Sequence, residues 1–343
     1  MDVSLNNLPI PTVSVIIPLY NKGKYIGRAL SSVLAQTHEP LEIIVVDDGS
    51  TDDGPEIVQK CKDPRTVLIR QENRGPGLAR NAGLSMAKGK YIAFLDADDE
   101  WYPSFLETGI SYLENDELGV TLVATGYLQC PRMRLSSKGL EYLRGVYEVT
   151  CGTEVNMVAD IEKFVHMGFS IIKTDIARKW GGYFDGFKCL RGEDTYFFLK
   201  LIFNERIGII PEPYGLYHTE ASDLFGCGYK TIPPLSVYLT HPDDIIASCP
   251  PDKRHILNAY LSLRAINNAV IYSKLGEKKK AVELLNRYCS NERYYSKQML
   301  IARLFSTVAP VLPSVRRIWQ LSKSIGRQIR TIFRFSCQLE GKQ

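Results

Sequence analysis

The chain has 343 residues, enough for one large domain or two ordinary ones. With 45% hydrophobic residues, 23% charged residues, 26 Gly and 18 Pro, it has the composition of a folded globular protein, which excludes a low-complexity chain. The net charge of +4 is unevenly divided: residues 253–343 hold 18 Lys and Arg against 4 Glu, a net +14, which leaves −10 for residues 1–252. A basic segment joined to an acidic body indicates a partner for that segment.

The sequence has no feature of a secreted or membrane-spanning protein. Residues 1–12 form a lead with Asp2 where a signal peptide would carry Lys or Arg. Apolar runs such as Val13–Tyr20 are far shorter than the roughly 18 residues that cross a bilayer. The eight cysteines lie at least 21 positions apart, and no Asn-x-Ser/Thr sequence occurs. We therefore expect reduced thiols and a cytoplasmic protein.

Apolar runs alternate with segments of helical periodicity over the first hundred residues. The pattern predicts strands at 13–18, 41–46, 66–70 and 91–95, and helices at 25–36, 54–61 and 77–87. This alternation predicts a Rossmann-like α/β fold, with a mostly parallel sheet flanked by helices. Ligands of such sheets bind beyond the carboxyl ends of the strands, so the residues that follow each strand are the candidate site.

The rest of the chain continues this alternation and then becomes helical. The pattern predicts a helix at 103–115, a strand at 119–125, a surface insertion or hairpin at 126–150, a helix at 156–166, a strand at 169–172, a helix at about 192–203 and a strand at 207–210. We expect an α/β domain over residues 13–235, a loop-rich linker over 236–252 and a helical C-terminal extension over 253–343.

Acidic residues follow two of the predicted strands. Asp96, Asp98 and Asp99 end the fourth strand, and Asp47-Asp48 ends the second. Carboxylates that are held together repel unless a cation joins them, and oxygen ligands favour Mg²⁺ or Mn²⁺, which in turn bridge phosphates. The alternative is an acidic helix-capping turn, which explains one such cluster more easily than two on the same edge of the sheet.

Three further segments hold residues that can bind or react. Gly75-Pro-Gly77-Leu-Ala-Arg80 nearly matches a dinucleotide fingerprint but has Arg in place of the third Gly, so it predicts an anion site or a plain solvated loop. Glu193-Asp194 opens a helix, where it can stabilise the helix dipole or supply a general base. His218 is either a metal ligand or a core histidine.

Taken together, these residues resemble the family 2 glycosyltransferases, which have the GT-A fold. The resemblance runs from Val13 to about Ser222 and rests on six ordered motifs: VSVIIPLYN (13–21), EIIVVDDGSTD (42–52), NRGPGLARNAG (73–83), GKYIAFLDADD (89–99), GGYFD (181–185) and GED (192–194). The family implies an inverting enzyme that uses a nucleotide-activated sugar.

The resemblance also implies roles for the residues at these motifs. Pro18 and Tyr20 would border the nucleotide pocket, and Asp48 would bind the imide of the base. Arg80 would lie near the phosphates, and Asp96 would hold the ribose.

The remaining motif residues would perform the transfer. Asp98 would bind a divalent metal, Mn²⁺ or Mg²⁺, with His218 as a second ligand, and Asp194 would deprotonate the acceptor hydroxyl. The implied donor is a nucleoside-diphosphate sugar, and the implied acceptor is a lipid-linked or growing glycan, as in the synthesis of cell-surface polysaccharide.

Two other functions are compatible with such a fold. A sugar-nucleotide nucleotidyltransferase would carry a Gly-rich loop after the first strand, and Pro18–Lys24 has too few glycines. A non-catalytic, membrane-associated scaffold would have no need to keep Asp48, Asp98 and Asp194 together.

The C-terminal stretch has a pattern of its own. Within residues 311–335, Val and Ile side chains fall on one helical stripe and five of the Arg and Lys side chains fall on other faces. Six basic residues and no acidic residue lie between Ser314 and Phe335. This predicts a basic amphipathic helix on an anionic bilayer, so that the protein is peripheral at the inner face of the cell membrane. The alternative is a helix that packs on the acidic α/β domain. Nucleic acid is not an expected partner, because the aromatic residues form no stacking platform.

Overall fold

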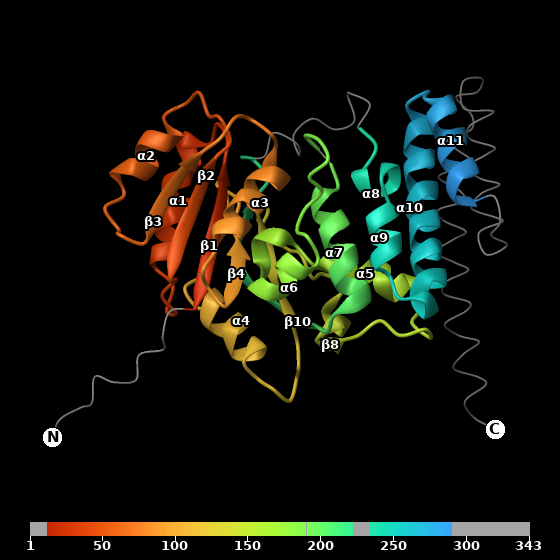
Figure 1. Ribbon diagram of the computed structural model, residues 1–343, viewed down its shortest axis with the longest axis horizontal. Coiled ribbons are helices and arrows are strands. Elements are labelled where there is room, and N and C mark those ends of the chain that lie inside the picture. Colours follow the sequence, from red (N-terminus) through yellow and green to blue (C-terminus); the bar gives the residue numbers. More distant parts are fainter. Residues whose placement is uncertain (1–11, 190, 222–233, 290–343) are drawn as a thin grey trace. The chain divides into compact units, whose positions relative to one another are not determined.

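The computed structural model describes residues 12–189, 191–221 and 234–289 (Figure 1). It divides into two units, Met1–Tyr260 and Leu261–Gln343. The first unit contains one mixed sheet with the strand order β3-β2-β1-β4-β9-β6-β10-β5.

Four parallel strands form one half of this sheet. They are β1 (Val13–Leu19), β2 (Glu42–Asp47), β3 (Thr66–Arg70) and β4 (Tyr91–Phe94), shown in red to orange in Figure 1. The helices α1 (Gly23–Leu34), α2 (Gly54–Lys60) and α3 (Pro76–Met86) connect them. Each element begins and ends within two residues of its predicted bounds, so the predicted parallel sheet is confirmed here.

The strand β1 passes through the core of this half. All seven of its residues are buried, and α3 packs on β1 and β2. The contact depends on Gly83, because a Cβ atom at this position would lie 2.6 Å from Cγ2 of Ile16. The helix therefore lies close against the sheet and fixes where the loop before it, at residues 71–75, meets the sheet edge.

The other half of the sheet is mixed. β9 (Ser170–Lys173) is antiparallel to both β4 and β6 (Leu122–Cys130), while β10 (Ile207–His218) is parallel to β6. β5 (Glu100–Trp101) and β8 (Gly145–Tyr147) pair antiparallel with β10. β7 (Arg134–Leu135) turns back on β6, which confirms the hairpin predicted within residues 126–150.

Helices surround the sheet and continue beyond it. They are α4 (Phe105–Leu113), α5 (Val155–Phe164), α6 (Thr174–Lys179) and α7 (Glu193–Asn204). The predicted linker 236–252 contains the short helices α8 (Val237–Thr240) and α9 (Asp243–Ser248).

The helical C-terminal portion is confirmed for α10 (Arg254–Lys274) and α11 (Lys278–Cys289). In the second unit, Ser262 Oγ donates a hydrogen bond to the Tyr288 carbonyl at 2.6 Å. Among the described helices, none has the length and apolar content needed to span a membrane. The predicted amphipathic helix at 311–335 lies outside the described residues.

Candidate active site

Asp48, at the carboxyl end of β2, organises the loop that follows β3. Its Oδ1 accepts hydrogen bonds from Gln71 Nε2 at 2.7 Å and from the Arg74 amide at 2.9 Å, and its Oδ2 accepts one from the Gly75 amide at 2.7 Å. An ionised carboxylate accepts about four hydrogen bonds, so Asp48 retains capacity for one more donor. On the neighbouring strand β1, Pro18 is buried, and Tyr20, which follows this strand, is 46% exposed.

Arg80 is a buried cation in α3 that contacts two distant motifs. Its Nη2 donates a hydrogen bond to Asp96 Oδ1 at 2.5 Å, its Nη1 lies 3.8 Å from Glu193 Oε1, and its guanidinium carbon lies 5.2 Å from the centre of the Tyr183 ring. Burial opposes the charge, but Asp96 and the other nearby groups raise the pKa of Arg80 above its ordinary value. Arg80 therefore links the end of β4 to the start of α7.

The three carboxylates after β4 have different environments. Burial alone would raise the pKa of Asp96, but Arg80 and His166 hold it below its ordinary value. Burial and the charge of Asp96 raise the pKa of Asp98, although Lys22 opposes this with its Nζ 3.1 Å from Asp98 Oδ2. Lys22 does not fully offset these two effects, and a further positive charge beside Asp98 would lower the pKa of Asp98.

Asp99 is fully buried behind these two residues. Burial, Asp96 and Asp98 raise its pKa well above the ordinary value. Its Oδ1 accepts a hydrogen bond from the His218 amide at 2.9 Å, while its buried Oδ2 has no hydrogen-bond partner among the described residues. Buried carboxylate oxygens of this kind have the donor chemistry that suits a hard divalent cation.

His218 directs both ring nitrogens at carboxylates. Nε2 lies 2.8 Å from Glu100 Oε1, and Nδ1 lies 2.7 Å from Glu220 Oε1. To ligate a metal, the ring would have to give up one of these contacts. Within the described part of the chain, no three or more His, Cys, Asp or Glu side chains converge in a way that could hold a metal ion. The oxygen donors of Asp98 and Asp99 therefore fit a cation better than His218 does.

Glu193 and Asp194 open α7 after Gly192, whose φ of 80° is the left-handed conformation that favours glycine. Glu193 faces Arg80, and burial, followed by the charge of Asp194, raises the pKa of Glu193 to about 7. Asp194 Oδ1 accepts a hydrogen bond from the Thr195 amide at 2.7 Å, which holds its carboxylate at the helix N-terminus. Glu193 therefore faces a buried cation, whereas Asp194 is held by the backbone at the start of α7.

His166 was not anticipated from the sequence. Its ring packs on Tyr127 with 5.0 Å between ring centres and on Tyr217 with 5.2 Å, and it interacts electrostatically with Asp96 and Asp194. Burial lowers its pKa against the effect of these two carboxylates. Nδ1 accepts from the Gly168 amide at 3.2 Å, so in the neutral ring Nε2 carries the proton.

No local motif marks His166, because it ends a predicted helix, and only the pairing of β6 with β9 brings Tyr127 beside it. Lys22 was missed for the same reason. Its Nζ reaches Asp98 and also donates to the Ala221 carbonyl at 2.5 Å, and neither residue is close to it in sequence.

The chain is similar to known proteins over the part that contains this edge of the sheet. The family model described as Glycosyl transferase family 2 matches residues 14–181, about half of the chain. This part of the chain belongs to glycosyl transferase family 2. The family 2 segment contains Asp48, Arg80, Asp96 and Asp98, whereas Asp194 and His218 lie beyond it.

Curated relatives align with about 105 residues of the chain. The chain is 48% identical over 105 residues to an uncharacterized glycosyltransferase of Rickettsia felis, covering 30% of this chain and 17% of that protein. It is 42% identical over 107 residues to Escherichia coli WfaP, named UDP-Glc:alpha-D-GlcNAc-diphosphoundecaprenol beta-1,3-glucosyltransferase, covering 31% of this chain and 43% of WfaP. The chain thus spans less than half the length of these relatives.

Solved structures share the fold over most of the chain. Staphylococcus aureus TarS 1–349 in complex with UDP-GlcNAc is 21% identical with a TM-score of 0.54, covering 85% of this chain and 79% of TarS. The mannosyltransferase PcManGT of Pyrobaculum calidifontis, in complex with GDP-Man and Mn²⁺, is also 21% identical with a TM-score of 0.54, covering 92% of this chain and 85% of PcManGT. The likeness shows that the sheet and its flanking helices have the GT-A fold.

Proposed function

We propose that the chain is an inverting glycosyltransferase, which moves a sugar from a nucleoside-diphosphate sugar to a hydroxyl group of an acceptor. The observation that carries this proposal is the position of Arg80, 2.5 Å from Asp96 and 3.8 Å from Glu193. Through Arg80, the acidic residues after β4 and the acidic start of α7 lie at the same edge of the sheet. An activated hydroxyl and a departing diphosphate require this proximity.

On the donor side, five residues have proposed binding roles. Pro18 and Tyr20 border the base, and the remaining acceptor capacity of Asp48 receives the imide hydrogen of the base. Arg80 provides fixed positive charge near the diphosphate, and Asp96, held by Arg80, receives the ribose hydroxyls. These roles agree with the burial and hydrogen bonds of each residue.

On the acceptor side, Asp194 takes the proton from the attacking hydroxyl. The oxygen then attacks the anomeric carbon from the face opposite the diphosphate, so the configuration inverts. Because Glu193 is the acid that faces Arg80, it compensates that charge, and Asp194 is left to act as the base. Arg80 stabilises the negative charge that grows on the leaving diphosphate.

We also propose that the reaction depends on Mn²⁺ or Mg²⁺. Asp98 would hold the ion, with the unpartnered Oδ2 of Asp99 behind it, and His218 would be a further ligand if its ring left Glu100. When bound, the ion supplies positive charge to the diphosphate. The raised pKa values of Asp98 and Asp99 and the Mn²⁺ in PcManGT support the proposal.

The names of the relatives suggest the substrate class. WfaP is named for UDP-Glc and a diphosphoundecaprenol-linked sugar, and the two solved structures hold UDP-GlcNAc and GDP-Man. We infer a nucleoside-diphosphate sugar as donor and a lipid-linked or growing glycan as acceptor. A lipid-linked acceptor would place the enzyme at the cytoplasmic face of a membrane, where the basic segment 311–335 would contact anionic lipid.

The Asp194→Asn variant tests the base. UDP, GDP, UDP-Glc, UDP-GlcNAc and GDP-Man are first screened with Mn²⁺ for a rise in melting temperature, because a bound ligand stabilises the fold. With the donor that binds, we expect Asp194→Asn to keep the same affinity and to release nucleoside diphosphate about 10²- to 10⁴-fold more slowly. Asp116→Asn, at an exposed position, is the matched control. An unchanged rate in Asp194→Asn would assign the base to another residue.

The Asp98→Asn variant tests the metal. Calorimetry gives the affinity of the full chain for the nucleoside diphosphate found in the screen, with and without Mn²⁺. We expect Mn²⁺ to increase this affinity at least tenfold in the wild type and to have no effect in Asp98→Asn, since the variant lacks the carboxylate. Equal affinities of the wild type with and without Mn²⁺ would rule out the metal role.

A further inference from the structure

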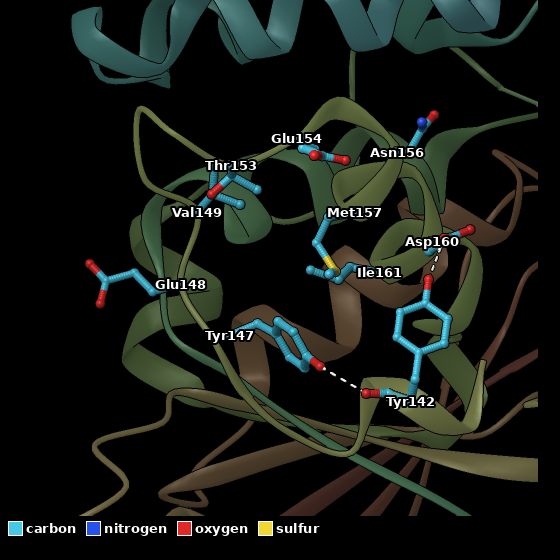
Figure 2. Close-up of a pocket in the computed structure, with 10 residues that line it drawn as sticks. All are labelled: Tyr142, Tyr147, Glu148, Val149, Thr153, Glu154, Asn156, Met157, Asp160 and Ile161. Carbon is cyan, nitrogen blue, oxygen red and sulfur yellow. Dashed lines mark hydrogen bonds between the residues drawn. The ribbon is translucent and has the colours of Figure 1, made fainter. Parts of the chain in front are cut away.

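A pocket of about 370 Å³ lies between the turn at Glu141–Leu143, the strand β8 and the helix α5 (Figure 2). This volume falls within the range of about 300–1,000 Å³ that is usual for small-ligand sites. Its lining residues are Tyr142, Tyr147, Glu148, Val149, Thr153, Glu154, Asn156, Met157, Asp160 and Ile161. None of them is among the residues assigned above to the donor, the metal or the base.

The lining combines apolar surface with oxygen acceptors. Two tyrosine rings and the apolar side chains of Val149, Met157 and Ile161 supply the apolar surface, and the polar groups include three carboxylates. Figure 2 shows the two rings on one side of the pocket, opposite Thr153 and Glu154. No Lys or Arg is among the lining residues, although Arg206 Nε lies 3.9 Å from Glu148 Oε2, so a phosphate or another anion would meet more negative than positive charge.

The tyrosines are held in place by hydrogen bonds across the pocket wall. Tyr147 Oη donates to the Tyr142 carbonyl at 3.3 Å, and Tyr142 Oη donates to Asp160 Oδ2. The second of these bonds, drawn as a dashed line in Figure 2, ties the turn before β8 to α5. An aromatic side chain already held by a hydrogen bond loses less side-chain entropy when a flat apolar face binds to it.

The helix that forms this pocket also supports the predicted base. Asp160 and Ile161 of α5 line the pocket, while the next residue, Glu162, accepts a hydrogen bond from Thr195 Oγ1 at 2.9 Å. Thr195 directly follows Asp194, so one turn of α5 contacts both the pocket and the start of α7. A ligand in the pocket therefore lies on an element that belongs to the acceptor side of the site.

We propose that this pocket binds a neutral sugar unit of the glycan acceptor, away from the point of transfer. A sugar ring offers an apolar C–H face for the tyrosines and several hydroxyl groups for Thr153 and the carboxylate of Glu154, which matches the lining. The proposal rests on the proposed function, because it assigns the sugar to the glycan acceptor of that reaction.

Monosaccharide binding to the full chain tests this inference. Glucose, galactose, mannose and N-acetylglucosamine are titrated and followed by saturation-transfer NMR and by the ring signals of labelled tyrosines. We expect at least one of them to shift the Tyr142 and Tyr147 signals, and glucuronate to bind at least threefold more weakly than glucose because of the carboxylates. If none of the four sugars shifts these signals, the proposal is wrong.

Two variants locate the binding. Tyr147→Ala should weaken sugar binding at least threefold, and Asn156→Trp, which puts a bulky side chain at an exposed lining position, should do the same without removing a tyrosine. Tyr20→Ala, at the proposed nucleotide edge, should have no effect. Loss of binding in Tyr20→Ala alone would place the sugar at the transfer site and overturn the proposal.

The two proposals can fail separately. Tyr147→Ala and Asn156→Trp should leave the melting-temperature shift with nucleoside diphosphate and Mn²⁺ unchanged. If nucleotide binds but no sugar reaches the pocket, the second sugar site is wrong and glycosyl transfer stands. If sugar reaches the pocket but no nucleotide or nucleotide sugar stabilises the chain, the proposed function is wrong, and with it the acceptor role of the pocket.

Discussion

Arg80 keeps its charge in the interior because acidic side chains surround it. Asp96 accepts its hydrogen bond and Glu193 lies near its other nitrogen. The two acids respond differently, since Arg80 lowers the pKa of Asp96, whereas burial and Asp194 raise that of Glu193 to about 7. Removing either acid would change the balance of charge around a cation that cannot reach solvent.

The raised pKa of Glu193 predicts a pH dependence of stability. An acid whose folded pKa lies above its unfolded value of 4.5 binds more protons in the folded state, so stability falls as the pH rises from about 4.5 to 7. Glu193→Gln lacks this ionisation, and we expect the wild type to lose about 2–3 kcal/mol more than the variant between pH 5 and pH 8. Urea unfolding at both pH values measures this difference. Equal losses of stability in the wild type and in Glu193→Gln would contradict the raised pKa of Glu193.

The sequence marks the candidate site residues better than it marks the residues that contact them. Asp48, Asp96, Asp98 and Asp194 stand in recognisable motifs. Arg80 contacts Asp96 and Glu193, and it thereby brings Asp96, Asp98 and Asp194 to one edge of the sheet. Lys22 and His166 are not marked by a motif, because their importance comes from contacts with residues far away in the chain.

Among the elements, the contact between α3 and β1 depends most on one small residue. Gly83 lets the helix lie against Ile16, and α3 carries Arg80 one turn earlier. If the helix moved away from the sheet, Arg80 would move relative to Asp96. Packing at Gly83 is therefore coupled to the charge arrangement of the proposed active site.

Gly83→Ala tests this coupling. The added Cβ would lie 2.6 Å from Ile16 Cγ2, so we expect a loss of about 1–3 kcal/mol in the free energy of unfolding and weaker nucleotide binding. Gly152→Ala is the control, because no atom lies within 4 Å of its Cβ position, and it should change stability by about 0.5 kcal/mol or less. Denaturant unfolding compares the two variants. If Gly83→Ala leaves the free energy of unfolding unchanged, α3 can move away from the sheet without loss of stability.

Charge is distributed unevenly along the whole molecule, and the net charge does not show this. The acidic residues 1–252 include the carboxylates at the sheet edge, where burial and the neighbouring carboxylates raise the pKa values of Asp98 and Asp99. The basic residues 253–343 include the segment 311–335. The net charge of +4 therefore describes neither part.

Removing residues 311–343 tests the membrane role of the basic segment. We expect the full chain to co-sediment with liposomes that contain phosphatidylglycerol and the truncated chain to stay in the supernatant. Binding of the full chain should weaken as salt is raised, because screening shortens the reach of surface charge. Liposomes of phosphatidylcholine alone are the control. Equal co-sedimentation of both chains with the anionic liposomes would refute the prediction.

The sequence by itself determined the parallel half of the sheet, since short β-branched runs and helical periodicity are local properties, and it located the acidic residues at the strand ends. Only the tertiary structure decided the mixed half, where β9 is antiparallel to both neighbours and β10 pairs with three strands. Strand direction depends on long-range pairing, which leaves no local signal. For the same physical reason, the pairing of Arg80 with Asp96 and Glu193 and the pocket beside α5 emerge only when the chain is folded.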